Sequence, residues 1–328
     1  MNMKNIRKFE TTAAMDAATL EDVSINYNAE TNKVLTYPLV GGGGESIKNY
    51  FRFVAVEDSV IKVSNIAGGS VSCDLSYSKN GEEWIKWDFT PIPLASNETL
   101  YMKGYNENGL TNFDNNRAVS FGAIFDSQGN NTKGSTGKFE CHGNVMSLLY
   151  GDDFEDKTTI PSAYCFYPLF YCCEGLLTPP ELPATTLTES CYTNMFIGCK
   201  SLTTAPELPA TTLAKGCYNG MFTSCESLTK SPELPATTLV QECYMSMFNE
   251  CRSLNEITML ATDISAVDCL RSWTLGTDKN YNNVSGVAET GTFFKHPDMH
   301  GLVVGNAQNS YSGIPEGWTV IDYDYNVG

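Results

Sequence analysis

The residues with the greatest chemical potential in this chain are cysteines, which recur at a fixed spacing. Nine of the twelve fall into two columns with a period of 26 residues: Cys165, Cys191, Cys217, Cys243 and Cys269 form the first, and Cys173, Cys199, Cys225 and Cys251 the second. Thiolates can bind zinc, thiol pairs can form disulfides, and buried thiols can pack as small apolar groups.

The spacing within a repeat weighs against zinc and against a disulfide inside one repeat. Cysteines eight positions apart, without a close Cys-x2-Cys pair or neighbouring histidines, are poor zinc ligands. On a helix these positions lie about 12 Å apart, which is too far for a disulfide. We therefore expect packed thiols and no cofactor or metal. Disulfides between neighbouring repeats remain an alternative.

Other residues that could do chemistry form no recognisable site. His142, His296 and His300 stand in unrelated segments, outside any serine, cysteine or metal motif. The acidic run 151–156 lacks the alternating ligand order of a calcium loop and suggests a solvated turn. Carboxylate pairs for glycoside hydrolysis cannot be chosen without geometry. We expect no catalytic residues and predict that the protein is not an enzyme.

The cysteines belong to a longer repeated unit. Leu182-Pro-Ala-Thr-Thr-Leu187 returns at 208–213 and again at 234–239. A fixed period of this size is typical of a solenoid, in which stacked repeats bury a common core. The apolar residues Cys191, Tyr192, Met195, Phe196 and Cys199 fall at i, i+1, i+4, i+5 and i+8, which predicts a helix with one buried face.

The flanking residues favour one helix and one strand per repeat. Thr186–Glu189 and Thr238–Gln241 match the capping box that starts a helix. Leu202 and Leu228 lie on short extended pieces, which the prolines that follow keep brief. The sequence therefore predicts an α/β leucine-rich-repeat solenoid over 151–328, closed by a C-terminal cap.

The repeated units also resemble a known family. Leu-Pro-Ala-Thr-Thr-Leu followed by Cys-Tyr-x2-Met-Phe-x2-Cys-x-Ser-Leu-Thr is similar to the bacterial surface-protein (BspA-like) leucine-rich repeats, over about residues 160–322. The tail from Gly291 to Val320 resembles the closing segment of such arrays. This resemblance implies an adhesive or recognition role on bacteria or on the phages that infect them, and it carries no catalytic residues.

Residues 46–150 read as an all-β sandwich. Strands are expected at 50–56, 60–63, 99–102 and 138–141, and Lys79-Asn80-Gly81 indicates a type I′ hairpin turn. The segment 144–150 reads as the strand that enters the solenoid. Trp84 and Trp87, with Tyr101 and Tyr105, could form a platform for stacking sugars, although such residues are more often core or hairpin pairs.

Residues 1–45 read as a small anchor module. Two alternating strands at 23–27 and 34–37 precede Gly41–Gly44, a flexible linker. The pattern from Ile6 to Tyr37 resembles N-terminal segments of phage fibre and appendage proteins. An ordinary hairpin that packs on the next domain is the alternative.

The net charge and the N-terminal residues indicate which partners the protein has and where it acts. The net charge of −17 argues against nucleic-acid and anionic-membrane partners. Met1–Glu10 has no apolar run of a secretory signal, and no stretch is long enough to span a membrane. We therefore expect a virion, with other virion proteins bound at the N-terminus and a trimer by resemblance. A bacterial cell-surface adhesin and a purely structural decoration protein are the alternatives.

The expected function is binding of a host surface protein or glycan by the repeats and the sandwich. Exposed strand positions should carry the contacts by multivalent weak binding. The candidate ligand-binding residues are the columns Thr178, Thr204, Lys230, Glu256 and Pro180, Pro206, Pro232, Thr258, together with Trp84 and Trp87.

Overall fold

The computed structural model describes residues 23–28, 33–38, 47–66, 70–113, 116–122, 134–277, 283–305 and 312–324. The chain divides into two compact units, residues 1–46 and 47–328. In the first unit, β1 (Val23–Asn28) pairs antiparallel with β2 (Lys33–Pro38), at the positions of the two predicted strands. Residues 1–22 of the expected anchor module and the Gly41–Gly44 linker lie outside the described residues.

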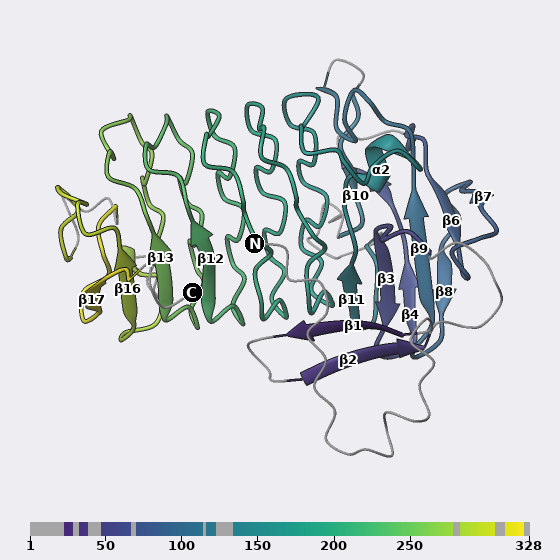
Figure 1. Cartoon of the computed structure of the whole chain (residues 1–328), viewed down its shortest axis with the longest axis horizontal. Coiled ribbons are helices and arrows are strands. Elements are labelled where there is room, and N and C mark those ends of the chain that lie inside the picture. Colours follow the sequence, from purple (N-terminus) through teal and green to yellow (C-terminus); the bar gives the residue numbers. More distant parts are fainter. Residues whose placement is uncertain are drawn as a thin grey trace. The chain divides into compact units, whose positions relative to one another are not determined.

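The second unit begins with a five-stranded sheet (Figure 1). Its order is β11 (Phe139–His142), β3 (Arg52–Ala55), β9 (Thr99–Lys103), β6 (Ser76–Ser78) and β7 (Ile85–Lys86), and all neighbours are antiparallel. Residues alternate between buried and half-buried along β3 and β9, so one face of the sheet enters the core. Phe53, Leu100 and Phe139 are fully buried on that face.

Two short ladders stand beside this sheet. β4 (Ser59–Ile61) pairs with β8 (Ile92–Leu94), and β5 (Ser64–Asn65) pairs with β10 (Val119–Ser120). The predicted type I′ turn is wrong. Tyr77 pairs with Ile85, so the connection is longer, and only Gly81 of the proposed pair has the positive φ that both turn residues require.

The segment predicted as an entering strand is instead the only α-helix among the described residues. α2 spans Ser147–Tyr150. Its Ser147 hydroxyl accepts a bond from the Phe51 amide at 3.0 Å and donates to the Met102 carbonyl at 3.1 Å. This side chain therefore links the helix to the sheet.

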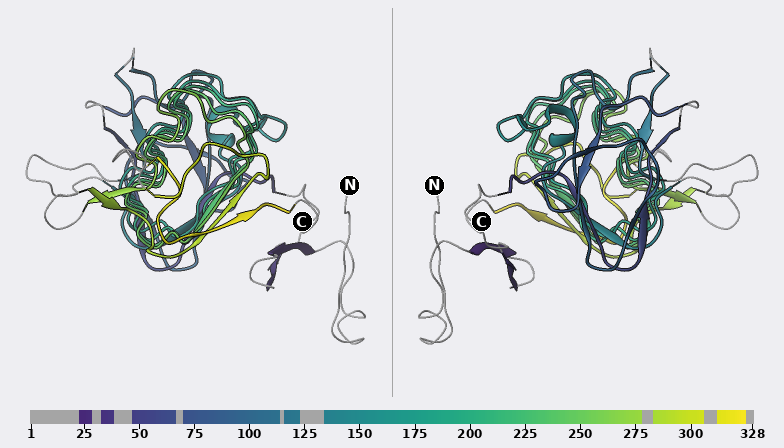
Figure 2. Two further views of the ribbon diagram at one scale, coloured as in Figure 1. Left: turned by 90° about the vertical axis from the view of Figure 1, so that its left-hand side faces the viewer. Right: turned by 90° about the vertical axis from the view of Figure 1, so that its right-hand side faces the viewer.

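The 26-residue repeats form successive layers built of turns rather than helices. We call residues 164–275 the turn stack. Within one layer, amides of odd-numbered residues from Cys191 to Cys199 close turns to carbonyls three residues earlier. Amides of even-numbered residues from Ser190 to Gly198 donate to carbonyls 25 residues later, in the next layer. Figure 1 shows the layers following one another, and along the stack in Figure 2 their traces superimpose.

A left-handed residue at every fourth position is the physical reason why no helix forms. Ser190, Asn194 and Gly198 have φ of 54°, 54° and 73°. Equivalent residues in the next layers are also left-handed, namely Gly216, Gly220, Ser224, Glu242, Ser246 and Glu250. A right-handed helix cannot continue through such residues. The capping boxes proposed at Thr186 and Thr238 accordingly start no helix.

The predicted fold class, with its α/β leucine-rich-repeat solenoid, is therefore wrong. The described residues are nearly all β, with strands and turns arranged in several small sheets and one helix of four residues. The repeats contribute strands only at β12 (Lys230–Leu234) and β13 (Glu256–Met259). The predicted helix in each repeat is absent from the described residues.

The C-terminal segment extends the sheet of these last repeats. β13 pairs in parallel with β16 (Thr292–Lys295), which pairs with β17 (Thr319–Asp322). A two-stranded ladder of β14 (Leu275–Thr277) and β15 (Asn283–Ser285) lies between β13 and β16 in the sequence. Trp318 is buried, and its indole donates to the Ala288 carbonyl at 2.8 Å.

The interior of the stack consists of columns of identical side chains. Phe170, Phe196, Phe222 and Phe248 stack with ring centroids 5.3, 5.7 and 5.9 Å apart and planes within 6°. The column continues into the sheet domain through Phe121 and Phe51. One hydrophobic core thus runs from the five-stranded sheet through the turn stack.

Candidate functional site

The first predicted ligand column lies on the surface but is partly engaged within the protein. Thr204 and Lys230 are exposed, whereas Thr178 and Glu256 are half-buried. Lys230 pairs with Glu256 at 2.9 Å. The Thr178 hydroxyl donates to the Cys141 carbonyl at 3.4 Å. The column is therefore accessible mainly at its centre.

Other charged columns pair in the same way. Lys200 pairs with Glu174 at 2.9 Å, and Lys215 pairs with Glu189 at 3.1 Å, each with the residue 26 positions earlier. Such exposed pairs contribute at most about 1 kcal/mol each. They favour in-register stacking of neighbouring layers, because a shifted layer would lose its partner.

The second predicted column is not available to a ligand. Pro180, Pro206, Pro232 and Thr258 are all buried. Strand alternation would place each of them on the same surface as the residue two positions earlier, but this rule holds only while the backbone stays regular. β12 departs from that regularity, with a register shift between Lys230 and Glu233.

The two candidate tryptophans differ in accessibility. Trp87 is 2% exposed, and its indole donates to the Thr90 carbonyl at 2.8 Å. It is a core residue and offers no ring face for stacking. Trp84 is half-buried, and the Lys103 ammonium lies 4.2 Å from its ring centroid. The predicted four-residue sugar platform is thus not assembled.

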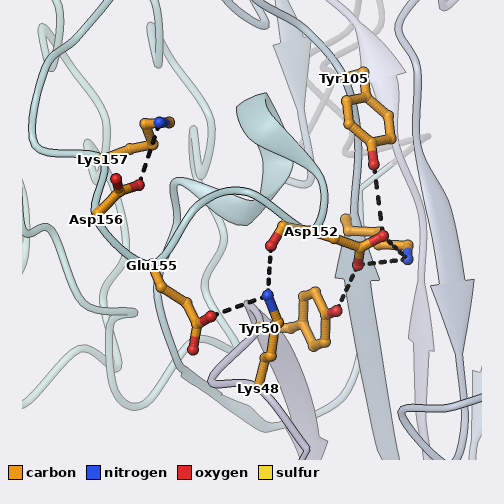
Figure 3. Close-up of polar contacts among 8 residues, drawn as sticks. Lys48, Tyr50, Tyr105, Asp152, Glu155, Asp156 and Lys157 are labelled. Carbon is orange, nitrogen blue, oxygen red and sulfur yellow. Dashed lines mark hydrogen bonds and ion pairs between the residues drawn. The ribbon is translucent and has the colours of Figure 1, made fainter.

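Trp84 instead borders a polar cluster around Asp152, because its ring centroid lies 4.8 Å from that of Tyr50. Figure 3 shows the polar contacts of this cluster. The Asp152 carboxylate accepts bonds from Lys103 at 2.7 and 2.9 Å and from the Tyr50 hydroxyl at 2.5 Å. Lys48 donates to the Asp152 carbonyl and pairs with Glu155 at 3.0 Å. These contacts attach the loop after α2 to β9 and to the segment before β3, which indicates a structural role for the acidic run.

The cluster sets the charge state of Asp152. Burial raises the pKa of this carboxyl, but the bonds donated by Lys103 and Tyr50 outweigh it, so the pKa lies below its usual value of 3.8. A lowered folded-state pKa stabilises the fold above the unfolded pKa. This stabilisation is lost as the pH falls through the folded value.

Asp152→Asn should destabilise the protein by about 1 kcal/mol at neutral pH, a value reduced for the partial exposure of the carboxylate. Chemical denaturation at pH 7 and pH 3 should show that the gap between variant and wild type narrows in acid. Asp156→Asn is the control, because this more exposed carboxylate pairs, among the described residues, only with the neighbouring Lys157 at 3.2 Å. Equal losses in the two variants would contradict the structural role of Asp152.

An accessible aromatic pocket lies elsewhere, beside the first layer of the turn stack. It measures about 290 Å³ and is lined by Asn108, Thr111, Asn112, Phe113, Ser162, Ala163 and Tyr164. Phe113 is 50% exposed. Its ring centroid lies 5.1 Å from that of Tyr164 and 5.6 Å from that of Tyr167. The lining combines aromatic rings with uncharged hydrogen-bonding groups.

The pocket is held by contacts between its two walls. The amide of Leu110 donates to the Cys165 carbonyl at 3.0 Å, and the Ser162 hydroxyl donates to the Asn108 carbonyl at 3.0 Å. Arg117 donates to the Gly109 carbonyl at 2.5 Å. A Cβ at Gly109 would come within 2.5 Å of the Ser162 hydroxyl, so this close approach requires glycine.

Sequence reasoning missed this pocket, although the repeats contained a signal for it. Tyr164 stands where later repeats have Ser190, Gly216 and Glu242, and Tyr167 stands where they have Thr193, Asn219 and Met245. The first layer therefore departs from its copies by placing two aromatic residues on the outer surface. Phe113 comes from a distant segment, and its position could not be read from the repeat.

The cysteine columns are buried inside the stack. Cys199, Cys225 and Cys251 donate to the carbonyls of Phe170, Phe196 and Phe222 at 3.1, 3.2 and 2.9 Å. Burial raises the pKa of all three thiols. Among the described residues no group of three or more histidine, cysteine or acidic side chains could hold a metal.

The remaining candidates for chemistry lie apart from the pocket. His142 contacts Glu140 at 2.9 Å, and His296 lies near Asp298 in the C-terminal segment. Within the described part of the chain, no helix has the length and apolar character needed to cross a membrane.

Comparisons with protein-family models, with curated proteins and with solved structures found no match.

Proposed function

We propose that the protein is a non-enzymatic adhesion protein and that its aromatic pocket binds a carbohydrate of the bacterial surface. The observation that carries the proposal is the half-exposed Phe113 beside Tyr164, with amide and hydroxyl groups around them. Flat aromatic rings suit the apolar faces of pyranose sugars, and neutral polar groups can bond to sugar hydroxyls.

The composition of the pocket favours a neutral sugar and binding without catalysis. Among the residues that the structure describes, its lining contains no Asp, Glu, His, Lys or Arg. This described lining presents no ionised group to pair with a charged sugar and no ordinary acid–base pair for glycoside cleavage. An open site with one aromatic wall should bind weakly, so adhesion would depend on several copies acting together.

Phe113→Ala should abolish binding of neutral monosaccharides. Saturation-transfer NMR with the methyl glycosides of glucose, galactose, mannose and N-acetylglucosamine would measure it, with glucuronic acid as the charged comparison. The wild type should bind at least one neutral sugar and bind glucuronic acid less. Ile85→Ala, which truncates a similarly exposed residue on the sheet, is the matched control and should bind as the wild type does.

Two results would overturn this assignment. Absence of binding of every sugar by the wild type would exclude a monosaccharide site, and equal binding by Phe113→Ala would place the ligand elsewhere. Binding lost equally in Thr204→Ala and Phe113→Ala would instead implicate the repeat column together with the pocket.

The setting of the protein is a separate part of the proposal. We infer that it is an appendage of a phage virion, because its N-terminal segment resembles such anchors. Immunodetection in purified virions tests this placement. Detection on intact bacterial cells, and not in particles, would favour the cell-surface adhesin.

A further inference from the structure

Three tyrosine hydroxyls inside the turn stack have no hydrogen-bond partner among the described residues. Tyr192, Tyr218 and Tyr244 occupy the same position in successive layers, and each is only 1% exposed. Their hydroxyl oxygens are fully buried and unpaired. Buried polar groups are nearly always bonded. Three equivalent exceptions therefore point to a small molecule that satisfies them.

The spacing of the rings defines what can bridge the hydroxyls. Ring centroids lie 5.8 Å apart for Tyr192 and Tyr218 and 6.0 Å apart for Tyr218 and Tyr244, with interplanar angles of 1° and 16°. Because the first two rings repeat almost by translation and the third is tilted by only 16°, we infer that neighbouring hydroxyl oxygens are separated by roughly the same distances as the ring centroids. That separation is too long for a direct bond, but an oxygen atom midway would lie about 3 Å from each hydroxyl.

The column of hydroxyls is closed at both ends. Phe166 stacks on Tyr192 at 5.6 Å, and Leu270 stands one repeat after Tyr244. Both are buried and neither carries a polar side-chain atom. The ligand must therefore be small enough to lie within the three-tyrosine segment, between the phenylalanine and the leucine.

The surroundings favour an uncharged ligand that both donates and accepts. Cys191 and Cys217 lie next to Tyr192, and burial raises the pKa of both thiols. Burial also raises the pKa of the three tyrosines. All these groups are neutral at physiological pH, and a tyrosine hydroxyl can donate one bond and accept another. Water meets these requirements.

We propose that two ordered water molecules occupy the interior of the stack, one between Tyr192 and Tyr218 and one between Tyr218 and Tyr244. Tyr218 donates to one water and accepts from the other. The outer tyrosines each contact one water, and the thiols beside them supply weak additional contacts. Buried waters of this kind are integral parts of a fold.

Tyr218→Phe tests the proposal, because it removes the partner shared by both waters. The folding equilibrium constant of the full chain should fall about five- to tenfold, and Tyr192→Phe should reduce it less. If no water were bound to the Tyr218 hydroxyl, Tyr218→Phe would leave the stability unchanged or raise it, because removing an unsatisfied buried hydroxyl is neutral or stabilising. Tyr101→Phe, on the half-buried surface of β9, controls for general effects of the substitution.

A crystal structure that resolves buried waters gives the second readout. Electron density is expected midway between the paired hydroxyls in the wild type and should be lost in Tyr218→Phe. Absence of density there in the wild type, or unchanged stability of Tyr218→Phe, would overturn the proposal.

Discussion

Phe222→Ala should destabilise the protein by about 3 to 5 kcal/mol, the range for removing a large buried aromatic side chain. Phe222 is fully buried and lies between Phe196 at 5.7 Å and Phe248 at 5.9 Å. The backbone on both sides is bonded to neighbouring layers, so the cavity cannot collapse easily. Equilibrium unfolding in urea would measure the loss.

The control for this substitution is Phe113→Ala, which removes the same atoms from a half-exposed position. It should cost far less stability while abolishing sugar binding. Similar losses in both variants would mean that the aromatic column contributes no more than a surface ring. The pair of variants thus separates packing in the stack from recognition at the pocket.

Gly143→Ala should be destabilising by about 2 to 5 kcal/mol, the sum of left-handed strain and a steric clash. Gly143 follows β11 with φ of 72°, and a Cβ there would lie 2.0 Å from the Tyr50 carbonyl oxygen. Because the obstructing atom belongs to the backbone, no side-chain rotation can relieve the contact. Thermal or urea denaturation would measure the effect.

Gly301→Ala provides the matched comparison. Gly301 has φ of 84°, but a Cβ there would meet no atom within 4 Å. The loss of stability in Gly301→Ala should be limited to the left-handed strain, about 1 to 2 kcal/mol. Equal losses at the two glycines would show that the contact with Tyr50 relaxes without cost.

The repeat and the identity of its buried residues could be read from the sequence, but the local conformation could not. Cys191, Met195 and Cys199 are spaced by four residues, and over so short a window that spacing cannot be distinguished from the 3.6-residue period of a helix. The predicted helix and the observed turns both bury these same residues. The deciding information lay in two other columns, where Gly216, Gly220 and Asn194 tolerate left-handed φ.

The candidate binding residues were predicted less well, for a related reason. Strand alternation predicts that the column of Pro180, Pro206, Pro232 and Thr258 lies on the surface. That rule requires a regular strand, which most layers lack. The pocket around Phe113 depends on the packing of residues 108–113 against the first layer, a long-range contact that no local pattern encodes. Strands in the N-terminal part of the second unit, such as β3 and β9, were predictable because their burial alternates.

The alternation of turn-closing and layer-crossing amides also constrains how such a chain can change its length. A duplication of 26 residues adds one complete layer, with its donors facing acceptors and its left-handed positions aligned. An insertion of one to three residues within this part of a layer would shift left-handed positions onto residues such as Met221 or Phe222 and misalign the bonds to the next layer. The layer, rather than the residue, is therefore the unit by which this architecture can be lengthened or shortened.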